Sequence, residues 1–319
     1  MDQFNRIAVV SRSFGKSSQA PLDYLLERGY DVRVRRSVNL HDPAEIASLI
    51  GEADCAIVGN DTIDAYVMDR CPNLKVVSKM GVGLDAIDLK EAEKRGIRVM
   101  YTPAANNESV ADLAVLLILG CLRHLREYMM TRPTPDWSVR AMGNELGGKT
   151  VGIVGFGRIG HAVAKRLTGF DVSMLAYDAY LPEDAELPAG VRRCGFDELL
   201  AGSDIVTIHA PLTGETAGMF CRETFEKMKP GSILINTARG GLVRTEDLRD
   251  ALKSGHIRAA GLDVFEEEPV KDEEMLQWES VLATPHIAAH TTEANIRMGM
   301  ECAVNADRAL CALRGEGIL

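Results

Sequence analysis

The sequence VGIVGFGRIG, residues 151–160, decides the fold of this 319-residue chain. An apolar segment of strand character leads into Gly155, Gly157 and Gly160, and an amphipathic helical pattern begins directly after them. In such a turn the glycines let the backbone approach a pyrophosphate closely, and the helix N-terminus supplies N–H groups and a positive dipole end. A GxGxxG pattern is weak alone, but between a strand and a helix it predicts a dinucleotide-binding unit.

The next predicted strand ends at Asp178, 18 residues beyond Gly160. This spacing is close to the separation of about 20 residues at which an acidic side chain hydrogen-bonds the ribose hydroxyls of a dinucleotide. A carboxylate repels a 2′-phosphate, and neither Ala179 nor Tyr180 offers a guanidinium to attract one. We therefore expect NAD rather than NADP. The alternative interpretation is that Asp178 only begins a turn toward Pro182.

Strand and helix patterns alternate on both sides of this unit. From residue 150 onward six strands are predicted, which make a complete doubly wound sheet: TVGIVG, VSMLAY, DIVTIHA, SILINTA, AAGLDVF and VLATP. Before it, short β-branched runs alternate with helical segments from residue 6 to residue 100, which is typical of a second parallel sheet. The predicted fold class is therefore α/β, with two doubly wound parallel-sheet domains.

Two long helical patterns define the predicted domain boundaries. Apolar residues follow a helical period from 106 to 130, and we expect this single helix to connect the domains. The last pattern, from about 292 to 313, follows a sheet that is already full, so we expect it to pack on the first domain. The predicted division is a discontinuous substrate-binding domain, residues 1–101 and 289–319, with an NAD-binding Rossmann domain, residues 102–288, inserted in it.

The composition argues against several classes of protein. The chain has 36 Lys and Arg against 46 Asp and Glu, a net charge of −10, and no long basic run, so neither nucleic acid nor an anionic membrane is an expected partner. Its seven cysteines include no CxxC pair, which disfavours a disulfide framework and a zinc ribbon. The N-terminus shows no secretory signal pattern, and the longest apolar run, 114–119, is too short to span a bilayer. A soluble cytoplasmic enzyme acting on small molecules fits these features.

Three ionisable residues follow successive predicted strands of the second sheet: Arg239, Glu268 and His286. The carboxyl ends of strands in an open parallel sheet are where ligands bind. A guanidinium binds the carboxylate of a 2-keto acid with two hydrogen bonds, a histidine protonates the keto oxygen as hydride arrives, and a glutamate orients the histidine. Taken singly, each residue has another interpretation: an exposed loop cation, a solvated acid, or a turn residue after Pro285.

Seven motifs occur in a fixed order along the chain, and the ordered set is more specific than any single motif. They are MGVGLDAID at 80–88, NNESVAD at 106–112, VGIVGFGRIG at 151–160, HAPLT at 209–213, NTARGG at 236–241, GLDVFEEEP at 261–269 and TPHIAAHTTEA at 284–294. In this order they resemble the D-isomer-specific 2-hydroxyacid dehydrogenase family, especially its phosphoglycerate-dehydrogenase-like branch. The resemblance covers nearly the whole chain. It implies a Rossmann NAD domain inserted in a flavodoxin-like substrate domain, and an NAD-dependent oxidoreductase that interconverts a small D-2-hydroxy acid and its 2-keto acid.

The resemblance also assigns residues to the site. It implies three catalytic residues: Arg239, Glu268 and His286. It implies a cofactor site formed by Gly155, Phe156, Gly157, Arg158, Ile159, Gly160, Asp178, His209, Ala210, Pro211, Thr237, Ala238, Arg239, Asp263 and His286. It implies a substrate site formed by Lys79, Met80, Gly81, Val82, Gly83, Arg239 and His286. Within these sets, backbone N–H groups of 80–83 would bind the substrate carboxylate, Asp263 would lie near the nicotinamide carboxamide, and residues 209–212 would line the adenine side.

The chain departs from the pattern of its relatives in two places. Relatives usually read PHIGG followed by a small residue, whereas this chain reads PHIAA at 285–289 followed by His290, so we hypothesise that His290 tunes substrate choice. No HExxH pattern is present, so a metal shared by His286 and His290 is not expected. Phosphoglycerate dehydrogenases hold the substrate phosphate with arginines, whereas the segment IVGNDT from Ile57 has none and Lys79 offers one point charge. The sequence therefore does not favour phosphoglycerate.

Alternative functions stay open. One is a 3-phosphoglycerate dehydrogenase of serine synthesis, another is a hydroxypyruvate or glyoxylate reductase, and a formate or phosphite dehydrogenase relative ranks below both. The non-enzymatic alternative is an NAD(H)-sensing protein that resembles the corepressors related to this family. We further expect domain closure about hinges near 101–105 and 288–291, a homodimer formed through the 106–130 helix and residues 131–147, and no regulatory domain beyond Leu319.

Overall fold

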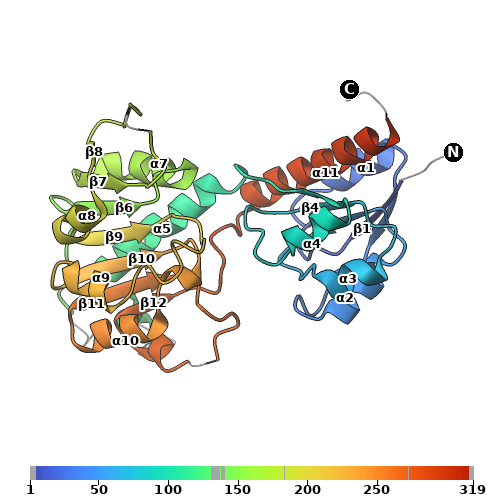
Figure 1. Cartoon of the computed structure of the whole chain (residues 1–319). Helices are drawn as coiled ribbons and strands as arrows, with labels where there is room; N and C mark the ends of the chain where they lie inside the picture. The colour runs from blue at the N-terminus through green and yellow to red at the C-terminus, as the bar shows by residue number, and fades with distance from the viewer. Residues whose placement is uncertain (1–4, 131–136, 138–140, 183, 272, 316–319) are drawn as a thin grey trace. The chain divides into compact units, whose positions relative to one another are not determined.

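The structure is a computed structural model that describes residues 5–130, 137, 141–182, 184–271 and 273–315 (Figure 1). The chain forms two compact units: unit 1 consists of Met1–Asn106 and His290–Leu319, and unit 2 consists of Asn107–Ala289. Unit 2 is therefore an insertion in unit 1. Each unit is built on its own parallel sheet, which confirms the α/β fold class.

Unit 1 contains, among its described residues, a five-stranded parallel sheet in the order β2-β1-β3-β4-β5, which is the order of flavodoxin-like folds. The strands are β1 (Arg6–Val9), β2 (Asp31–Val34), β3 (Cys55–Val58), β4 (Val76–Lys79) and β5 (Arg98–Met100). The helices are α1 (Ala20–Glu27), α2 (Pro43–Ile50), α3 (Ala65–Arg70), α4 (Leu89–Lys94) and α11 (Thr292–Arg314). Every residue of β3, CAIV, is buried, as expected for a strand in a sheet that is covered on both faces.

The C-terminal helix α11 packs on unit 1, which confirms the prediction made from its position after a full sheet. The helix begins after Thr291, whose side chain accepts a hydrogen bond from the Ala294 N–H group. It packs against α1 and β4 (Figure 1). The Ser78 hydroxyl of β4 donates to the Cys302 carbonyl of α11 at 2.9 Å, so a polar contact fixes the helix on the sheet as well as an apolar one.

Unit 2 contains, in its described part, a seven-stranded parallel sheet in the order β12-β11-β10-β9-β6-β7-β8. Its strands are β6 (Thr150–Val154), β7 (Ser173–Tyr177), β8 (Val191–Arg193), β9 (Ile205–Ile208), β10 (Ser232–Asn236), β11 (Ile257–Leu262) and β12 (Val281–Ala283). Its helices are α5 (Asn107–Leu122), α6 (Leu125–Met130), α7 (Arg158–Leu167), α8 (Phe196–Gly202), α9 (Arg222–Lys227) and α10 (Thr245–Lys253). The prediction of six strands missed β8, because this edge strand is three residues long, reads VRR and has no fully buried residue.

The predicted single helix over 106–130 is wrong, because the structure divides this segment into α5 and α6. His124 lies between them with a φ angle of 53°, a left-handed conformation that an α-helix does not contain. The Leu122 carbonyl accepts a hydrogen bond from the Asn144 N–H group at 2.9 Å instead of continuing the helical ladder. The apolar period runs through the break without a change, so the sequence pattern did not reveal it.

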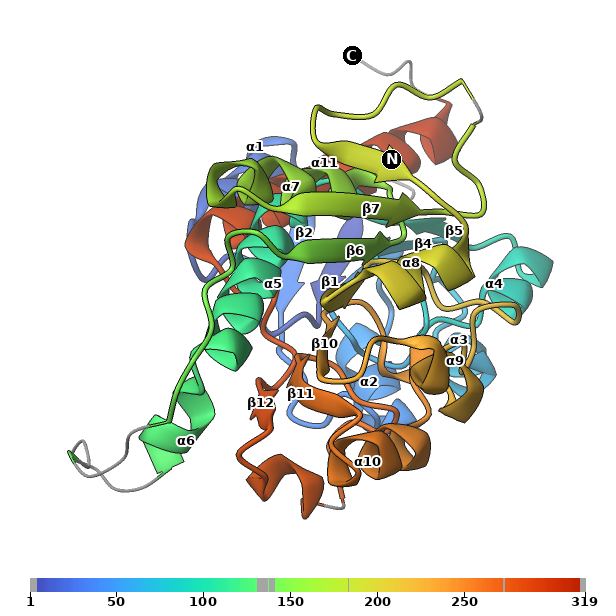
Figure 2. The ribbon, with the colours of Figure 1, turned by 90° about the vertical axis from the view of Figure 1, so that its left-hand side faces the viewer.

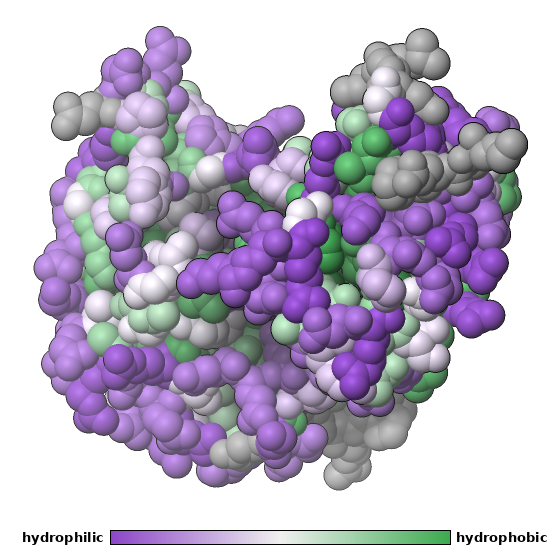
Figure 3. Space-filling view, turned by 45° about the vertical axis from the view of Figure 1, so that its right-hand side comes forward, coloured by the Kyte–Doolittle hydropathy of each residue, from purple (hydrophilic) through white to green (hydrophobic). Residues whose placement is uncertain are grey.

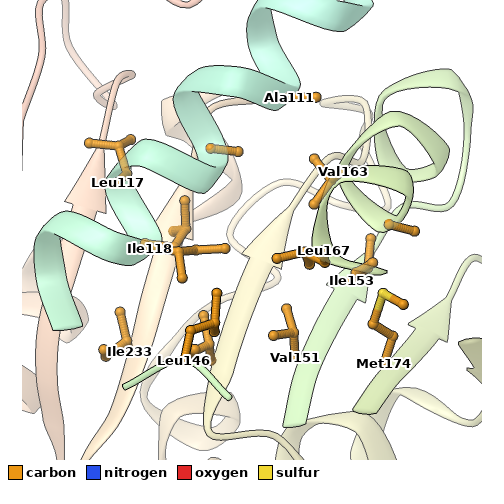
Figure 4. Close-up of a cluster of buried hydrophobic side chains, with 14 of the residues drawn as sticks. Ala111, Leu117, Ile118, Leu146, Val151, Ile153, Val163, Leu167, Met174 and Ile233 are labelled. Atoms are coloured by element: carbon orange, nitrogen blue, oxygen red, sulfur yellow. The ribbon is translucent and has the colours of Figure 1, made fainter. Parts of the chain in front are cut away.

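Unit 2 has a buried apolar cluster on each face of its sheet: one is covered by α8, α9 and α10, and the other lies between the sheet and the helices α5 and α7. Side chains from β6, β7 and β10 meet side chains from both helices there; Figure 4 labels Ala111, Leu117, Ile118, Leu146, Val151, Ile153, Val163, Leu167, Met174 and Ile233 of this cluster. Helix α5 packs along α7 (Figure 2). Hydrophilic residues cover most of the face shown in Figure 3. Among the described residues, no helix combines the length and the apolar character needed to cross a membrane.

Candidate active site

Most of the predicted site residues of unit 2 lie at one edge of its sheet. Gly155 directly follows β6, Asp178 follows β7, His209 follows β9, Thr237 follows β10 and Asp263 follows β11. These five strands are neighbours in the sheet. Because parallel strands end on the same side, the sheet brings the dinucleotide turn and the strand-end residues to a common edge.

The three glycines of the turn are required for different reasons. Gly155 has a φ angle of +88°, and a Cβ atom there would lie 2.5 Å from the Ala210 nitrogen. A Cβ atom on Gly160 would lie 2.4 Å from the Gly155 carbonyl oxygen. Gly157 differs, because a Cβ atom there would meet no atom of the protein within 4 Å. Helix α7 begins at Arg158 directly after this open position, so the first and third glycines serve the fold and the second leaves room for a ligand.

Asp178 is tied to the turn through both carboxylate oxygens. Oδ2 accepts a hydrogen bond from the Phe156 N–H group at 2.8 Å, and Oδ1 accepts one from the Tyr180 N–H group at 2.9 Å. The second contact shows that Asp178 does begin a local turn, as the alternative interpretation held. The first places the carboxylate beside the glycine turn, where a ribose-binding acid is expected. The two interpretations are therefore compatible, and ribose binding stays a prediction.

His209 packs beside the glycine turn. Its backbone N–H group donates to the Val154 carbonyl at 2.6 Å, and its ring Nε2 atom lies 2.9 Å from the Thr207 hydroxyl. The residue is partly exposed as a whole, but its Nδ1 atom is buried and has no hydrogen-bond partner among the described residues. Burial lowers the pKa of His209 to about 3, so the ring is neutral near pH 7.

Arg239 is positioned by a turn at the end of β10. The Asn236 side chain accepts from the Ala238 N–H group at 3.0 Å and donates to the Arg239 carbonyl at 2.9 Å. The Arg239 guanidinium donates to the Ala238 carbonyl at 2.6 Å. Gly240 is essential to this geometry, because a Cβ atom there would overlap the Phe265 carbonyl carbon at 1.9 Å. Asn236 is not among the predicted site residues, although it stands in the NTARGG motif.

Glu268 and His286 form a hydrogen-bonded pair. The Nδ1 atom of His286 lies 2.7 Å from Glu268 Oε2, and Glu268 Oε1 accepts from the Phe265 N–H group at 2.9 Å. Partial burial acts to raise the pKa of Glu268, but the hydrogen bonds from His286 and Phe265 and the nearby charge of Arg239 outweigh it and lower that pKa. Glu268 is therefore ionised near pH 7 and fixes the ring orientation of His286.

Asp263 holds the loop that carries His286. It is fully buried, and its carboxylate accepts from the Thr284 hydroxyl at 2.6 Å and from the N–H groups of Ile287 and Ala288 at 2.8 and 2.9 Å. The backbone N–H group of His286 donates to the backbone carbonyl of Asp263 at 2.9 Å, and His286 has a φ angle of 53°. The structure thus gives Asp263 a positioning role, in addition to the contact with a nicotinamide carboxamide that the resemblance implies.

The predicted substrate residues Lys79–Gly83 follow β4 in unit 1. Lys79 is 3% exposed, and its Nζ atom donates to Asn60 Oδ1 at 3.0 Å and to the Met80 carbonyl at 3.2 Å. The Gly81 N–H group donates to the Thr102 hydroxyl at 2.9 Å, so it is already occupied. No hydrogen bond of the Val82 or Gly83 N–H group is found within the described part of the chain. Those two groups are therefore the better candidates for binding a carboxylate.

The remaining predicted residues divide between the units. Phe156, Ile159, Ala210, Pro211, Thr237 and Ala238 lie at the same sheet edge as Gly155, and His290 is an exposed residue of unit 1. The Thr237 hydroxyl is buried without a hydrogen-bond partner in the described structure. Among the described residues, no three His, Cys, Asp or Glu side chains are arranged to hold a metal ion.

Comparison with known proteins identifies the family. Residues 115–288 match the sequence model of the D-isomer specific 2-hydroxyacid dehydrogenase family, NAD binding domain. The chain belongs to this family.

The similarity to known proteins extends beyond residues 115–288. A hydroxypyruvate reductase from Thermotoga maritima is 43% identical over 262 residues, which are 81% of this chain and 85% of that protein. A D-3-phosphoglycerate dehydrogenase from Mycobacterium leprae is 41% identical over 283 residues, 88% of this chain but 53% of that protein. The chain thus spans about half the length of the phosphoglycerate dehydrogenase that it matches. The solved structure of the TT0316 protein from Thermus thermophilus has a TM-score of 0.84 and 38% identity, covering 98% of this chain and 97% of that one.

Proposed function

We propose that this 2-hydroxyacid dehydrogenase uses NAD(H) to interconvert a small, unphosphorylated 2-keto acid and its D-2-hydroxy acid, with hydroxypyruvate and glyoxylate as the favoured keto acids. The observation that carries this proposal is the Glu268–His286 pair, at 2.7 Å, on the sheet edge that also carries the glycine turn. A proton donor of this kind and a dinucleotide turn are the two elements that a 2-keto acid reduction needs.

The residues at the sheet edge fit a dinucleotide. The space in front of Gly157 is open, and the buried atoms Thr237 Oγ1 and His209 Nδ1 lack protein partners among the described residues. The carboxylate of Asp178 disfavours a 2′-phosphate, which supports NAD over NADP. When bound, the nicotinamide supplies the hydride that is added to the keto carbon.

The protein's own residues supply the proton and the carboxylate site. His286 is held through Nδ1 by Glu268, so its Nε2 atom is the one that donates a proton to the substrate oxygen in reduction and accepts it in oxidation. Arg239 presents a guanidinium that binds the substrate carboxylate through two parallel hydrogen bonds.

The substrate preference follows from the residues of unit 1 that would face a phosphate group. The Lys79 ammonium is already bound by Asn60 and by the Met80 carbonyl, and the segment after β3 offers a buried carboxylate, Asp61, rather than an arginine. A substrate phosphate, with its two negative charges, would have no arginine in this segment to bind two of its oxygens at once. The similarity to a hydroxypyruvate reductase over most of both chains supports the same choice.

Steady-state reduction of a panel of keto acids, followed by NADH absorbance, tests this proposal. The panel contains hydroxypyruvate, glyoxylate, pyruvate and phosphohydroxypyruvate. We expect kcat/KM for hydroxypyruvate or glyoxylate to exceed that for phosphohydroxypyruvate by about tenfold or more. A bound phosphate gives up hydrogen bonds to water, and the lack of even one charge-assisted hydrogen bond in return has at least that effect. A preference for phosphohydroxypyruvate would overturn the substrate assignment. Tight NADH binding without turnover of any keto acid would overturn the enzymatic function itself.

We also propose that the protein is a cytoplasmic homodimer. Large apolar side chains are exposed on and after α6, namely Leu125, Met129, Trp137 and Met142, and exposed apolar side chains favour association with a second copy. All seven cysteines are free thiols, which suits a reducing compartment. Light scattering should give twice the mass of the chain, and a monomer at micromolar concentration would contradict the dimer. Cell fractionation tests the compartment.

A further inference from the structure

A polar pocket lies at the other end of the unit 2 sheet from the candidate active site. Its volume is about 180 Å³. Its lining includes Lys149, which directly precedes β6, Asp204, which directly precedes β9, Ser232, the first residue of β10, and Lys229, three residues before it. Because the candidate active site follows the carboxyl ends of these strands, a strand length of roughly 16 Å separates the two regions. The pocket is therefore distinct from the dinucleotide turn.

The pocket carries an excess of positive charge. Lys149, Lys229 and Arg258 line it, against one carboxylate, Asp204. That carboxylate already accepts from Lys229 Nζ at 3.0 Å and from the Thr150 N–H group at 2.8 Å. Burial acts to raise the pKa of Asp204, but these hydrogen bonds and the charges of Lys229 and Lys149 lower it. Three cations against one carboxylate leave the pocket lining with a net positive charge.

Two of the lining residues each have a buried side-chain polar atom that lacks a hydrogen-bond partner among the described residues: Ser232 Oγ and Arg258 Nε. Ser232 is 2% exposed, and the Arg258 guanidinium donates through Nη1 to the Asn144 side chain. Buried polar groups in folded proteins nearly always have a partner, so an unpaired one points to a bound water or ion. Both atoms carry a hydrogen that they can donate, and the ligand class that accepts from donors beside uncompensated cations is an anion.

We propose that this pocket binds a small oxyanion of the phosphate class, with Lys149 and Arg258 as its charged ligands. A lysine supplies a point charge and an arginine supplies a planar set of donors, and both bind phosphate oxygens in proteins. The pocket has several times the volume of about 30 Å³ that one water molecule occupies in the liquid, so a tetrahedral anion fits. Since the walls belong to four strands of one sheet, an anion here binds the folded unit and stabilises it.

Thermal unfolding of the whole chain in inorganic phosphate tests the site, with sodium chloride at matched ionic strength as the reference. Saturating NADH is present throughout, so that phosphate cannot act at the glycine turn. We expect Tm to rise in a saturable way at millimolar phosphate, beyond the rise in chloride and well below the molar concentrations at which phosphate stabilises folded proteins by exclusion from their surface, and sulfate to act in the same way. Equal Tm values in phosphate and chloride would refute the proposal.

Single variants locate the anion. Lys149→Gln and Arg258→Gln each remove one charged ligand and should weaken phosphate binding, measured by titration calorimetry, about tenfold or more. Lys90→Gln, an exposed lysine of α4, should leave phosphate affinity unchanged. Retained NADH binding shows that each pocket variant is folded, and one folded variant of the two suffices. Wild-type phosphate affinity in a folded pocket variant would mean an adventitious ion only, bound elsewhere, and would overturn the site.

Discussion

The glycines of the 155–160 turn show how one residue type meets different physical demands within six positions. Gly155 is required by a left-handed backbone and by the close approach of the strand β9 end, and Gly160 by contact with the Gly155 carbonyl. Gly157 faces open space and has an ordinary negative φ angle. The sequence motif does not distinguish the three glycines. In the structure, Gly155 and Gly160 are required by the fold, whereas Gly157 leaves space for a ligand.

This separation predicts opposite phenotypes for two alanine variants. Gly157→Ala should change the free energy of unfolding by less than about 0.5 kcal/mol, because the added methyl group meets no protein atom. The same methyl group would stand where the pyrophosphate approaches, so we expect the Kd for NADH to rise at least about tenfold. Gly160→Ala should instead destabilise the chain by about 1–3 kcal/mol through overpacking. Urea unfolding and NADH fluorescence titration measure both, and tight NADH binding by Gly157→Ala would contradict the assignment.

At the scale of elements, helix α11 is held on unit 1 by a polar cluster around Asp307. Its carboxylate accepts from the Tyr30 hydroxyl at 2.8 Å and from the Tyr24 hydroxyl at 3.0 Å, and it lies 3.2 Å from Arg28 Nε. Burial, followed by the hydrogen bond to Asp307, raises the pKa of Tyr30, so this hydroxyl stays a donor at any physiological pH. The cluster joins α11 to α1 and to the residue directly before β2, which precede Asp307 by 283 and 277 residues in the sequence.

Asp307→Ala should therefore destabilise unit 1 by about 2–3 kcal/mol, because it leaves the Tyr30 hydroxyl buried without its acceptor and removes the partner of Arg28. The matched control is Arg308→Ala, an exposed neighbour on the same helix, which should change stability by less than about 0.5 kcal/mol. Urea denaturation gives both values. Equal stability of the two variants would show that apolar packing alone holds α11 in place.

Elements with a strong apolar period could be predicted from the sequence, and elements fixed by other forces could not. The βαβ order and the docking of α11 followed from the period and from the count of strands. The break at His124 and the strand β8 did not, because one depends on a hydrogen bond from Asn144 and the other has no buried residue. In the same way the motifs pointed to His286, but the three hydrogen bonds from its loop to Asp263 are visible only in the structure.

At the scale of the whole molecule, a protein with a net charge of −10 has to concentrate positive potential where anions bind. The N-terminus of α7 and Arg239 lie at one edge of the unit 2 sheet, Lys149 and Arg258 at the other, and Lys79 at the carboxyl edge of the unit 1 sheet. Each of these positive groups lies near the end of a strand. The sheets therefore create local positive sites in a protein whose net charge is negative.

The global stability should also depend on pH through His209. Its native pKa of about 3 lies far below the value of about 6.5 in an unfolded chain, so between these values the unfolded state binds more protons. His209 therefore does not lower the free energy of unfolding above about pH 6.5, and it lowers it progressively as the pH decreases toward 3. The slope from this residue is at most about 1.4 kcal/mol per pH unit. His209→Gln should flatten the decline between pH 6 and 4 in urea denaturation of the chain without NAD, whereas the exposed-residue control His41→Gln should follow the wild type. A wild-type slope in His209→Gln would mean that the acid destabilisation comes from other groups and that the ring is not buried in its neutral form.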